Sequence, residues 1–372
     1  MSELIAINSV SSTAPEWDNG NRPVIDKLAS WLDSLGFQTE IIPLKGSHAK
    51  ANLIATLGSG PGGLVLSGHT DTVPFNESRW SSNPLSVTER DNKLFGLGTT
   101  DMKGFFPIVI EAARAFADRP LQQPLIILAT ADEESSMDGA RELAQLGRPK
   151  ARAAVIGEPT SLKPIRMHKG MMMEAITVEG RSGHSSNPLL GNNALEAMHI
   201  VISDLLAFRQ QLQERYRNPL FAIDLPTLNL GCIHGGDSPN RICGQCELHF
   251  DLRPLPGMDI DTLKQTLQQR LLPIAERLQV NISLRSLMAG VPAFEQAADT
   301  ELVKLAERLT GYSTGSVAYA TEGPFLQQLG MDTIVMGPGC IDQAHQPDEF
   351  MAMDQIDPAI NIFKQLIAEY CL

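Results

Sequence analysis

The sequence lacks any apolar run long enough to cross a membrane. No stretch approaches the ~18 apolar residues that a spanning helix needs. Residues 1–5 have no basic segment ahead of their apolar residues, whereas a secretory signal carries one. Both absences favour a cytoplasmic protein. Internal repeats and low-complexity segments are absent as well.

Basic residues are scarce relative to acidic ones. Lys and Arg total 30, Asp and Glu total 43, and the formal net charge is −13. This balance argues against nucleic acid or an anionic membrane as a partner, because both attract positively charged surfaces. It is compatible with a small cationic substrate, although many acidic proteins bind none.

Cysteine is scarce too, with five residues in a chain of 372. A chain of this length needs no disulfides to form a core, and an odd number of cysteines gives no complete pairing. Cys243 and Cys246 match the spacing of a redox or zinc pair. The residues that follow, 247–253, alternate like a strand, whereas a reactive pair opens a helix. We therefore favour a chance pair of reduced thiols over a redox or metal role.

Short apolar runs, by contrast, are frequent. The chain is 43% hydrophobic and 20% charged, and its length favours two domains over a single core. Helical and strand patterns alternate over the first 167 residues. The continuous apolar runs at 64–67, 125–129 and 153–156 are typical of strands covered on both faces. They predict an α/β fold in which helices sandwich a mainly parallel sheet.

The pattern changes near residue 168 and returns after about residue 288. Alternation and helical periodicity predict strands at 174–178, 222–231 and 246–253 and helices at 193–217 and 259–278. These segments indicate a small α+β domain. We therefore predict one domain from residues 1–167 and 289–372, with residues 168–288 inserted as a second domain.

Acidic and histidine residues recur where the predicted strands end or a helix begins. These residues are His69, Asp101, Glu133, Glu134, Glu158 and His345. Parallel strands share one carboxyl edge, where open α/β sheets bind ligands. Taken singly, each residue is more often a capped histidine or a solvated carboxylate. Their repeated placement predicts that they meet in one crevice.

Charge counting indicates more than one cation in that crevice. The carboxylates of Asp101, Glu133, Glu134 and Glu158 would repel one another strongly without cations. Two divalent ions bring four positive charges, three liganding carboxylates remove three, and one hydroxide cancels the last. A metal-bridging hydroxide is also the nucleophile that a two-metal hydrolase needs.

At these residues the chain resembles the dinuclear zinc metallohydrolases of the aminoacylase and carboxypeptidase type. The motifs that carry the resemblance span most of the chain: 67–74, 98–104, 130–134, 157–160, 183–186 and 344–349. Segments 233–243, 251–258 and 337–341 are similar to the bacterial branch that deacetylates N2-acetyl-L-ornithine. Residues 2–7 look like the remnant of a longer first helix in the family, and Ala320 departs from its pattern.

The resemblance implies a ligand set for two zinc ions. His69 and Glu158 hold one ion, Glu134 and His345 hold the other, and Asp101 bridges both. Ligands of nitrogen and oxygen without thiolate suit zinc, with cobalt or manganese as possible substitutes.

It also implies catalytic roles. Asp71 orients the His69 imidazole from the same face of the extended chain. Glu133 is the general base, and His184 of the inserted domain reaches the partner subunit's site to steady the oxyanion. The alternatives are a turn-initiating aspartate and an ordinary turn histidine.

Substrate-binding residues are less sharply defined by the sequence. Arg253 is a candidate for the substrate α-carboxylate, with a surface ion pair to Asp251 or Glu247 as the alternative. Asn240 is a candidate hydrogen-bonding residue. Glu322 is one guess for the group that recognises the side-chain amine.

The implied activity is hydrolysis of N2-acetyl-L-ornithine to L-ornithine and acetate, a step of arginine biosynthesis. The same chemistry on N-succinyl-diaminopimelate, acetylcitrulline or another N-acyl amino acid is the alternative. A non-catalytic protein that uses Cys243 and Cys246 is a third reading. The resemblance further implies a homodimer that forms through the inserted lid and dimerisation domain.

Overall fold

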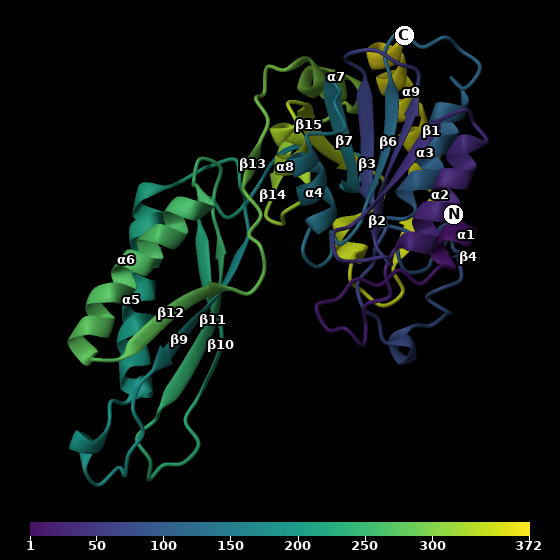
Figure 1. The fold of residues 1–372 in the computed structure, drawn as a ribbon. Coiled ribbons are helices and arrows are strands. Elements are labelled where there is room, and N and C mark those ends of the chain that lie inside the picture. Colours follow the sequence, from purple (N-terminus) through teal and green to yellow (C-terminus); the bar gives the residue numbers. More distant parts are fainter. The chain divides into compact units, whose positions relative to one another are not determined.

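The computed structural model describes all residues, Met1–Leu372, and the chain divides into two compact units (Figure 1). The first unit contains Met1–Arg166, Gln296–Gly315 and Thr321–Leu372. The second contains Met167–Glu295 and Ser316–Ala320. The sequence placed the division at 167 and 289 and did not single out residues 316–320. No helix combines the length and apolarity needed to cross a membrane.

The central sheet of the first unit has the strand order β1-β2-β6-β3-β7-β15, and the short strands β8, β13 and β14 lie where the chain passes from one unit to the other. The strands are β1 (Gln38–Pro43), β2 (Ala51–Leu57), β3 (Leu64–His69), β6 (Leu125–Thr130), β7 (Ala153–Pro159), β8 (Ile165–His168), β13 (Phe294–Glu295) and β15 (Asp332–Gly337). β14 (Gly315–Val317) pairs with β8. Strands β6, β3, β7 and β15 are mutually parallel, whereas β1 and β2 are antiparallel. The predicted α/β class with a mainly parallel sheet is confirmed.

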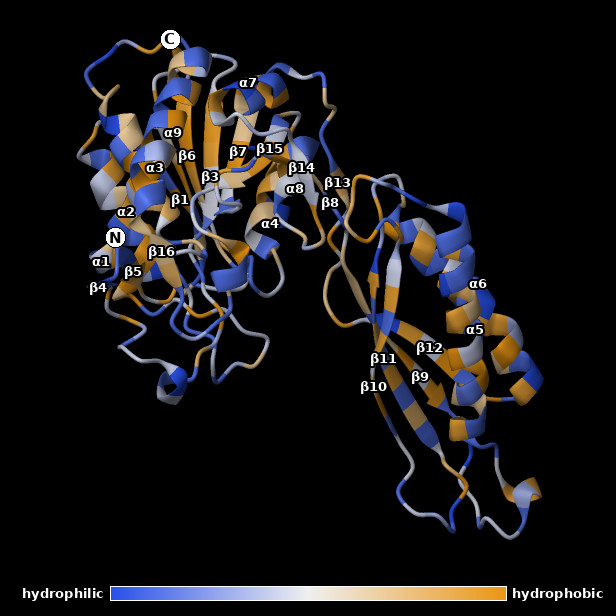
Figure 2. Ribbon diagram, turned by 180° about the vertical axis from the view of Figure 1, so that it is seen from behind, coloured by the Kyte–Doolittle hydropathy of each residue, from blue (hydrophilic) through white to orange (hydrophobic).

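Helices cover both faces of this sheet, as the two opposite views show (Figures 1 and 2). Helices α2 (Arg22–Asp33), α3 (Phe105–Arg114), α7 (Glu301–Thr310) and α9 (Ile356–Cys371) pack with alternate strand residues, such as Leu64 and Leu66, in one core. Helices α4 (Asp138–Leu146) and α8 (Gly323–Gln328) contact each other, and α8 contacts β15. The central strands are therefore buried on both sides, which explains their continuous apolar runs.

Smaller elements complete the first unit. They are the short helix α1 (Ser2–Ile5) and a three-stranded sheet of β4 (Thr88–Arg90), β5 (Lys93–Phe95) and β16 (Phe350–Ala352). Helix α7 ends at Gly311, which adopts φ +73°, a left-handed conformation that glycine enters without steric cost.

The second unit is an antiparallel sheet with two long helices. Its strand order is β10-β11-β9-β12, with β9 (Met172–Glu179), β10 (Thr227–Gly235), β11 (Gln245–Arg253) and β12 (Asn281–Ser286). Helices α5 (Ala194–Arg215) and α6 (Ile260–Leu278) pack on it, and the side chains of Asn193 and Asp259 cap them. In β11, buried residues alternate with more exposed ones, so the strand that follows Cys243 is confirmed.

Candidate metal centre

Three of the predicted ligands come from neighbouring parallel strands. His69 is the last residue of β3, Glu134 lies four residues beyond the end of β6, and Glu158 lies near the end of β7. β3 pairs with both of the other strands, so their carboxyl ends meet at one edge. Asp101 lies before α3 and His345 after β15, and both reach the same edge.

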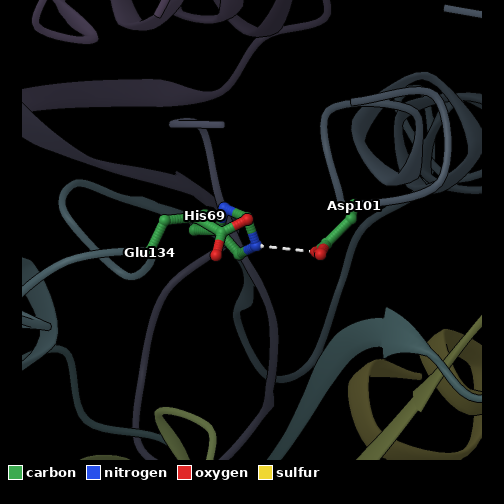
Figure 3. Close-up of side chains that lie close together, drawn as sticks. All are labelled: His69, Asp101 and Glu134. Atoms are coloured by element: carbon green, nitrogen blue, oxygen red, sulfur yellow. Dashed lines mark hydrogen bonds and ion pairs between the residues drawn. The ribbon is translucent and has the colours of Figure 1, made fainter. Parts of the chain in front are cut away.

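Asp101 lies between two imidazoles. Its Oδ1 is 3.1 Å from Nε2 of His69, and its Oδ2 is 3.3 Å from Nε2 of His345 (Figure 3 shows the His69 contact). His345 Nε2 also lies 2.9 Å from a carboxylate oxygen of Glu134. The carboxylate of Asp101 thus presents a different oxygen to each histidine, the arrangement that a bridging ligand requires.

Two groups of potential ligands overlap at His69. Ligand atoms of His69, Asp101 and Glu134 lie within 4.8 Å of one another, and so do those of His69, Glu133 and Glu158. Glu158 Oε1 is 4.0 Å from His69 Nε2, is buried, and has no hydrogen-bond partner. A buried oxygen without a hydrogen-bond partner is suited to bind a divalent cation. The other potential ligands are imidazole nitrogens and carboxylate oxygens, with no thiolate, which suits the same kind of ion.

Burial and mutual repulsion shift the protonation equilibria of the site. Burial raises the pKa of Glu158 to about 8, and burial together with Glu158 raises the pKa of Glu133 well above its ordinary value. Burial opposes ionisation of Asp101, yet hydrogen bonds from His345 and His69 hold the pKa of Asp101 below its usual range. The same hydrogen bond to Asp101 contributes to raising the pKa of His345 to about 10. The carboxylates of the cluster outnumber its imidazoles, so burial and repulsion make some of them retain protons in the absence of cations, and bound cations would take the place of those protons.

Asp71 holds the backbone of the two glutamates. Its Oδ1 accepts the N–H of Glu133 at 3.3 Å, and its Oδ2 accepts the N–H of Glu134 at 3.0 Å. The second ring nitrogen of His69, Nδ1, lies 3.0 Å from the backbone oxygen of Asp71 and 3.6 Å from its carboxylate. The Asp71 main chain, rather than its side chain, is thus the closer partner of the imidazole.

Glu349 holds the loop that carries Asp101. This buried carboxylate accepts the N–H groups of Thr100 and Asp101 on one oxygen and that of Gly98 on the other.

His345, four residues before Glu349, adopts φ +59°. A residue with a side chain pays about 1–3 kcal/mol for such backbone strain, and strained residues of this kind cluster at functional sites.

Reasoning from the sequence missed Glu349 as a structural anchor, although it lies in the motif at 344–349. Glu322, only a guess from the sequence, is buried with Oε1 unpartnered, and burial raises its pKa to about 7. A hydrogen bond with Thr130, the last residue of β6, and the charge of His69 partly oppose that rise.

A cavity of about 800 Å³ in the first unit reaches His345. Trp17, Phe75, Trp80 and Leu97 contribute to its lining, and the His345 side chain is 54% exposed. The metal-centre residues are thus mostly buried, while one imidazole remains accessible from this cavity.

The remaining predicted residues belong to the second unit. His184 lies in an exposed loop, where its Nδ1 is 2.7 Å from the hydroxyl of Ser186. The backbone oxygen of Asn240 accepts the N–H of Ser185, so the loops of His184 and Asn240 adjoin. Arg253 donates through Nε to Asp251 at 2.8 Å, the ion pair that the sequence left as its alternative role.

Comparison with known proteins finds a family and relatives that match most or all of the chain. The family model "Peptidase family M20/M25/M40" matches residues 65–369. An acetylornithine deacetylase of Pasteurella multocida is 50% identical over 370 residues, covering 100% of this chain and 97% of its own. Among solved structures, the aminopeptidase PepT of Bacillus cereus has a TM-score of 0.76 at 18% identity, covering 99% of this chain and 96% of its own. The Bacillus subtilis YXEP protein, described as a dinuclear metal-binding peptidase of family M20, has a TM-score of 0.69 at 14% identity, with 99% and 95% covered. This chain belongs to peptidase family M20/M25/M40.

Proposed function

We propose that this protein is a metal-dependent amidohydrolase that converts N2-acetyl-L-ornithine to L-ornithine and acetate. The observation that carries the proposal is the carboxylate of Asp101 between His69 and His345, in a chain half identical to relatives named acetylornithine deacetylase. Because that identity extends over the full length, it favours acetylornithine over other acylated amino acids.

The family resemblance supplies the ligand assignment, and the convergence of these side chains at one edge of the sheet supports it. His69 and Glu158 would hold one ion, Glu134 and His345 the other, and Asp101 both. Imidazole and carboxylate donors suit zinc, and cobalt would be a substitute of similar preference. When bound, the ions supply Lewis acidity toward the amide carbonyl and make water easier to deprotonate.

Glu133 is the proposed general base. Its carboxylate lies in one group with His69 and Glu158, whose ligand atoms are within 4.8 Å of one another, so it is within reach of a water molecule at the metal centre. It would accept a proton from the attacking water and return it to the leaving amine. The hydrogen bond from its N–H to Asp71 keeps its backbone fixed during both transfers.

Residues of the second unit would bind substrate. Arg253 would exchange its contact with Asp251 for the substrate carboxylate, and Asn240 would add a hydrogen bond. His184, on an exposed loop, would stabilise the oxyanion in the partner subunit of a homodimer formed through this unit. The roles of the second unit as lid and dimerisation domain are predictions from the sequence. The cytoplasmic location of the protein is a prediction of the same kind.

Substrate choice is tested by steady-state assays on a panel of N-acyl amino acids. We expect the highest kcat/KM for N2-acetyl-L-ornithine, ahead of N-acetylcitrulline, N-acetylmethionine and N-succinyl-diaminopimelate. A tenfold difference corresponds to about 1.4 kcal/mol in the barrier. A preference above tenfold for the succinyl substrate would contradict the proposal.

Replacing the proposed base should separate chemistry from metal binding. We expect Glu133→Ala to lower kcat by about 10²- to 10⁴-fold, the usual contribution of a general base, while elemental analysis still finds both metals. Glu111→Ala, on the exposed side of α3, is the matched control and should keep full activity. Near-normal turnover in Glu133→Ala would remove this residue from the mechanism.

Metal removal should destabilise the fold. An ion present at about 100 times its Kd stabilises the folded state by about 2.7 kcal/mol, and its loss also restores repulsion between the carboxylates. We expect a chelator to lower the melting temperature by several degrees and added zinc to restore it. If calorimetry found the same melting curve after elemental analysis had verified metal removal, the charge argument would be wrong.

A further inference from the structure

The loop that carries Glu133 and Glu134 begins with a strained turn at Asp132. This residue adopts φ +61°, although it has a side chain, and it is 7% exposed. Its backbone oxygen accepts the N–H groups of Ser136 at 3.0 Å and Met137 at 2.6 Å. The direction in which the chain leaves Asp132 therefore sets where the two glutamates lie.

The side chain of Asp132 is fixed from two directions. Its Oδ1 accepts the hydroxyl of Ser11 at 2.7 Å and lies 2.7 Å from Nζ of Lys50. Ser11 Oγ also lies 2.6 Å from Oγ of Ser135, in the same loop. The side chains of Lys50 and Asp132 are 14% and 9% exposed, so solvent screens this ion pair less than a surface pair.

Lys50 connects this loop to the rigid part of the unit. It directly precedes β2, a strand of the central sheet, and its Nζ also lies 2.8 Å from Asp18. Burial disfavours the charged ammonium, but hydrogen bonds to Asp132 and Asp18 more than offset it and raise the pKa of Lys50. The charged side chain of Lys50 is thus held between the sheet and the loop, and no step of the proposed hydrolysis uses it.

We infer that Lys50 is a positioning residue: through its ion pair with Asp132 it fixes the backbone on which Glu133 is placed for proton transfer. Asp71 anchors the N–H groups of Glu133 and Glu134, and Lys50 anchors the residue immediately before them. A misplacement of ~1 Å at a reacting group can cost about 10²-fold in rate. This inference rests on the proposed function.

The test compares three variants of the full-length, metal-loaded enzyme. Lys50→Met removes the charge, Lys50→Arg keeps it, and Lys45→Met removes a nearby exposed lysine as the matched control. We expect Lys50→Met to lower kcat at least tenfold, with KM changed less than threefold and both metals retained. Lys50→Arg should recover most of the lost kcat, and Lys45→Met should behave as wild type.

A double-mutant cycle asks whether Lys50 acts through Asp132. We expect Asp132→Asn to lower kcat by a similar factor, and the double variant to be no slower than the slower single variant. If Lys50→Met does not fold, Ser11→Ala, which removes the hydroxyl contacts to Asp132 and Ser135 of the same loop, should still lower kcat with KM unchanged.

The outcomes separate this inference from the proposed function. If wild type hydrolyses N2-acetyl-L-ornithine but Lys50→Met keeps its kcat, the positioning role is wrong and the function stands. Losses that multiply in the double variant would also overturn it, since independent residues behave in that way. A wild type without activity on any N-acyl amino acid would overturn both.

Discussion

The structure depends on keeping several carboxylates together away from water. Asp101 and Glu158 are buried and Glu133 is partly buried, while His69 and His345 are the imidazoles that contact this cluster. Uncompensated buried charge costs several kcal/mol per ion even after relaxation. Protons can reduce this cost, as the raised carboxyl pKa values indicate. Two divalent cations would remove it and would also supply the Lewis acidity that hydrolysis needs.

Other contacts of the site act on the backbone rather than on the ligands themselves. Asp71 accepts the N–H groups of Glu133 and Glu134, and Glu349 accepts three N–H groups of the loop around Asp101. A hydrogen bond of this kind contributes about 0.5–1.5 kcal/mol. Because these hydrogen bonds fix the backbone of the ligand-bearing loops, the side chains keep their places despite their mutual repulsion.

The sequence was most informative where a residue's place follows from strand ends. His69 and Glu158 terminate buried parallel strands, so the sheet topology alone predicts their convergence. Lys50 and Asp132 gave no comparable signal, because they are 82 positions apart in the sequence and no shared pattern links them. The main-chain partner of His69 was also missed: spacing suggested the Asp71 carboxylate, but the backbone oxygen of Asp71 lies closer to the imidazole. The antiparallel pairings of β2 with β1 and with β6 are not encoded in apolar runs.

The most direct test of the account is the metal content of purified wild type and of an Asp101→Ala variant, measured by elemental analysis on preparations assayed for deacetylation. The account predicts two metal ions per active wild-type chain. In the variant it predicts fewer than two ions and loss of activity, because the residue facing both histidines is missing. A single ion in fully active wild type, or two ions retained without Asp101, would contradict it.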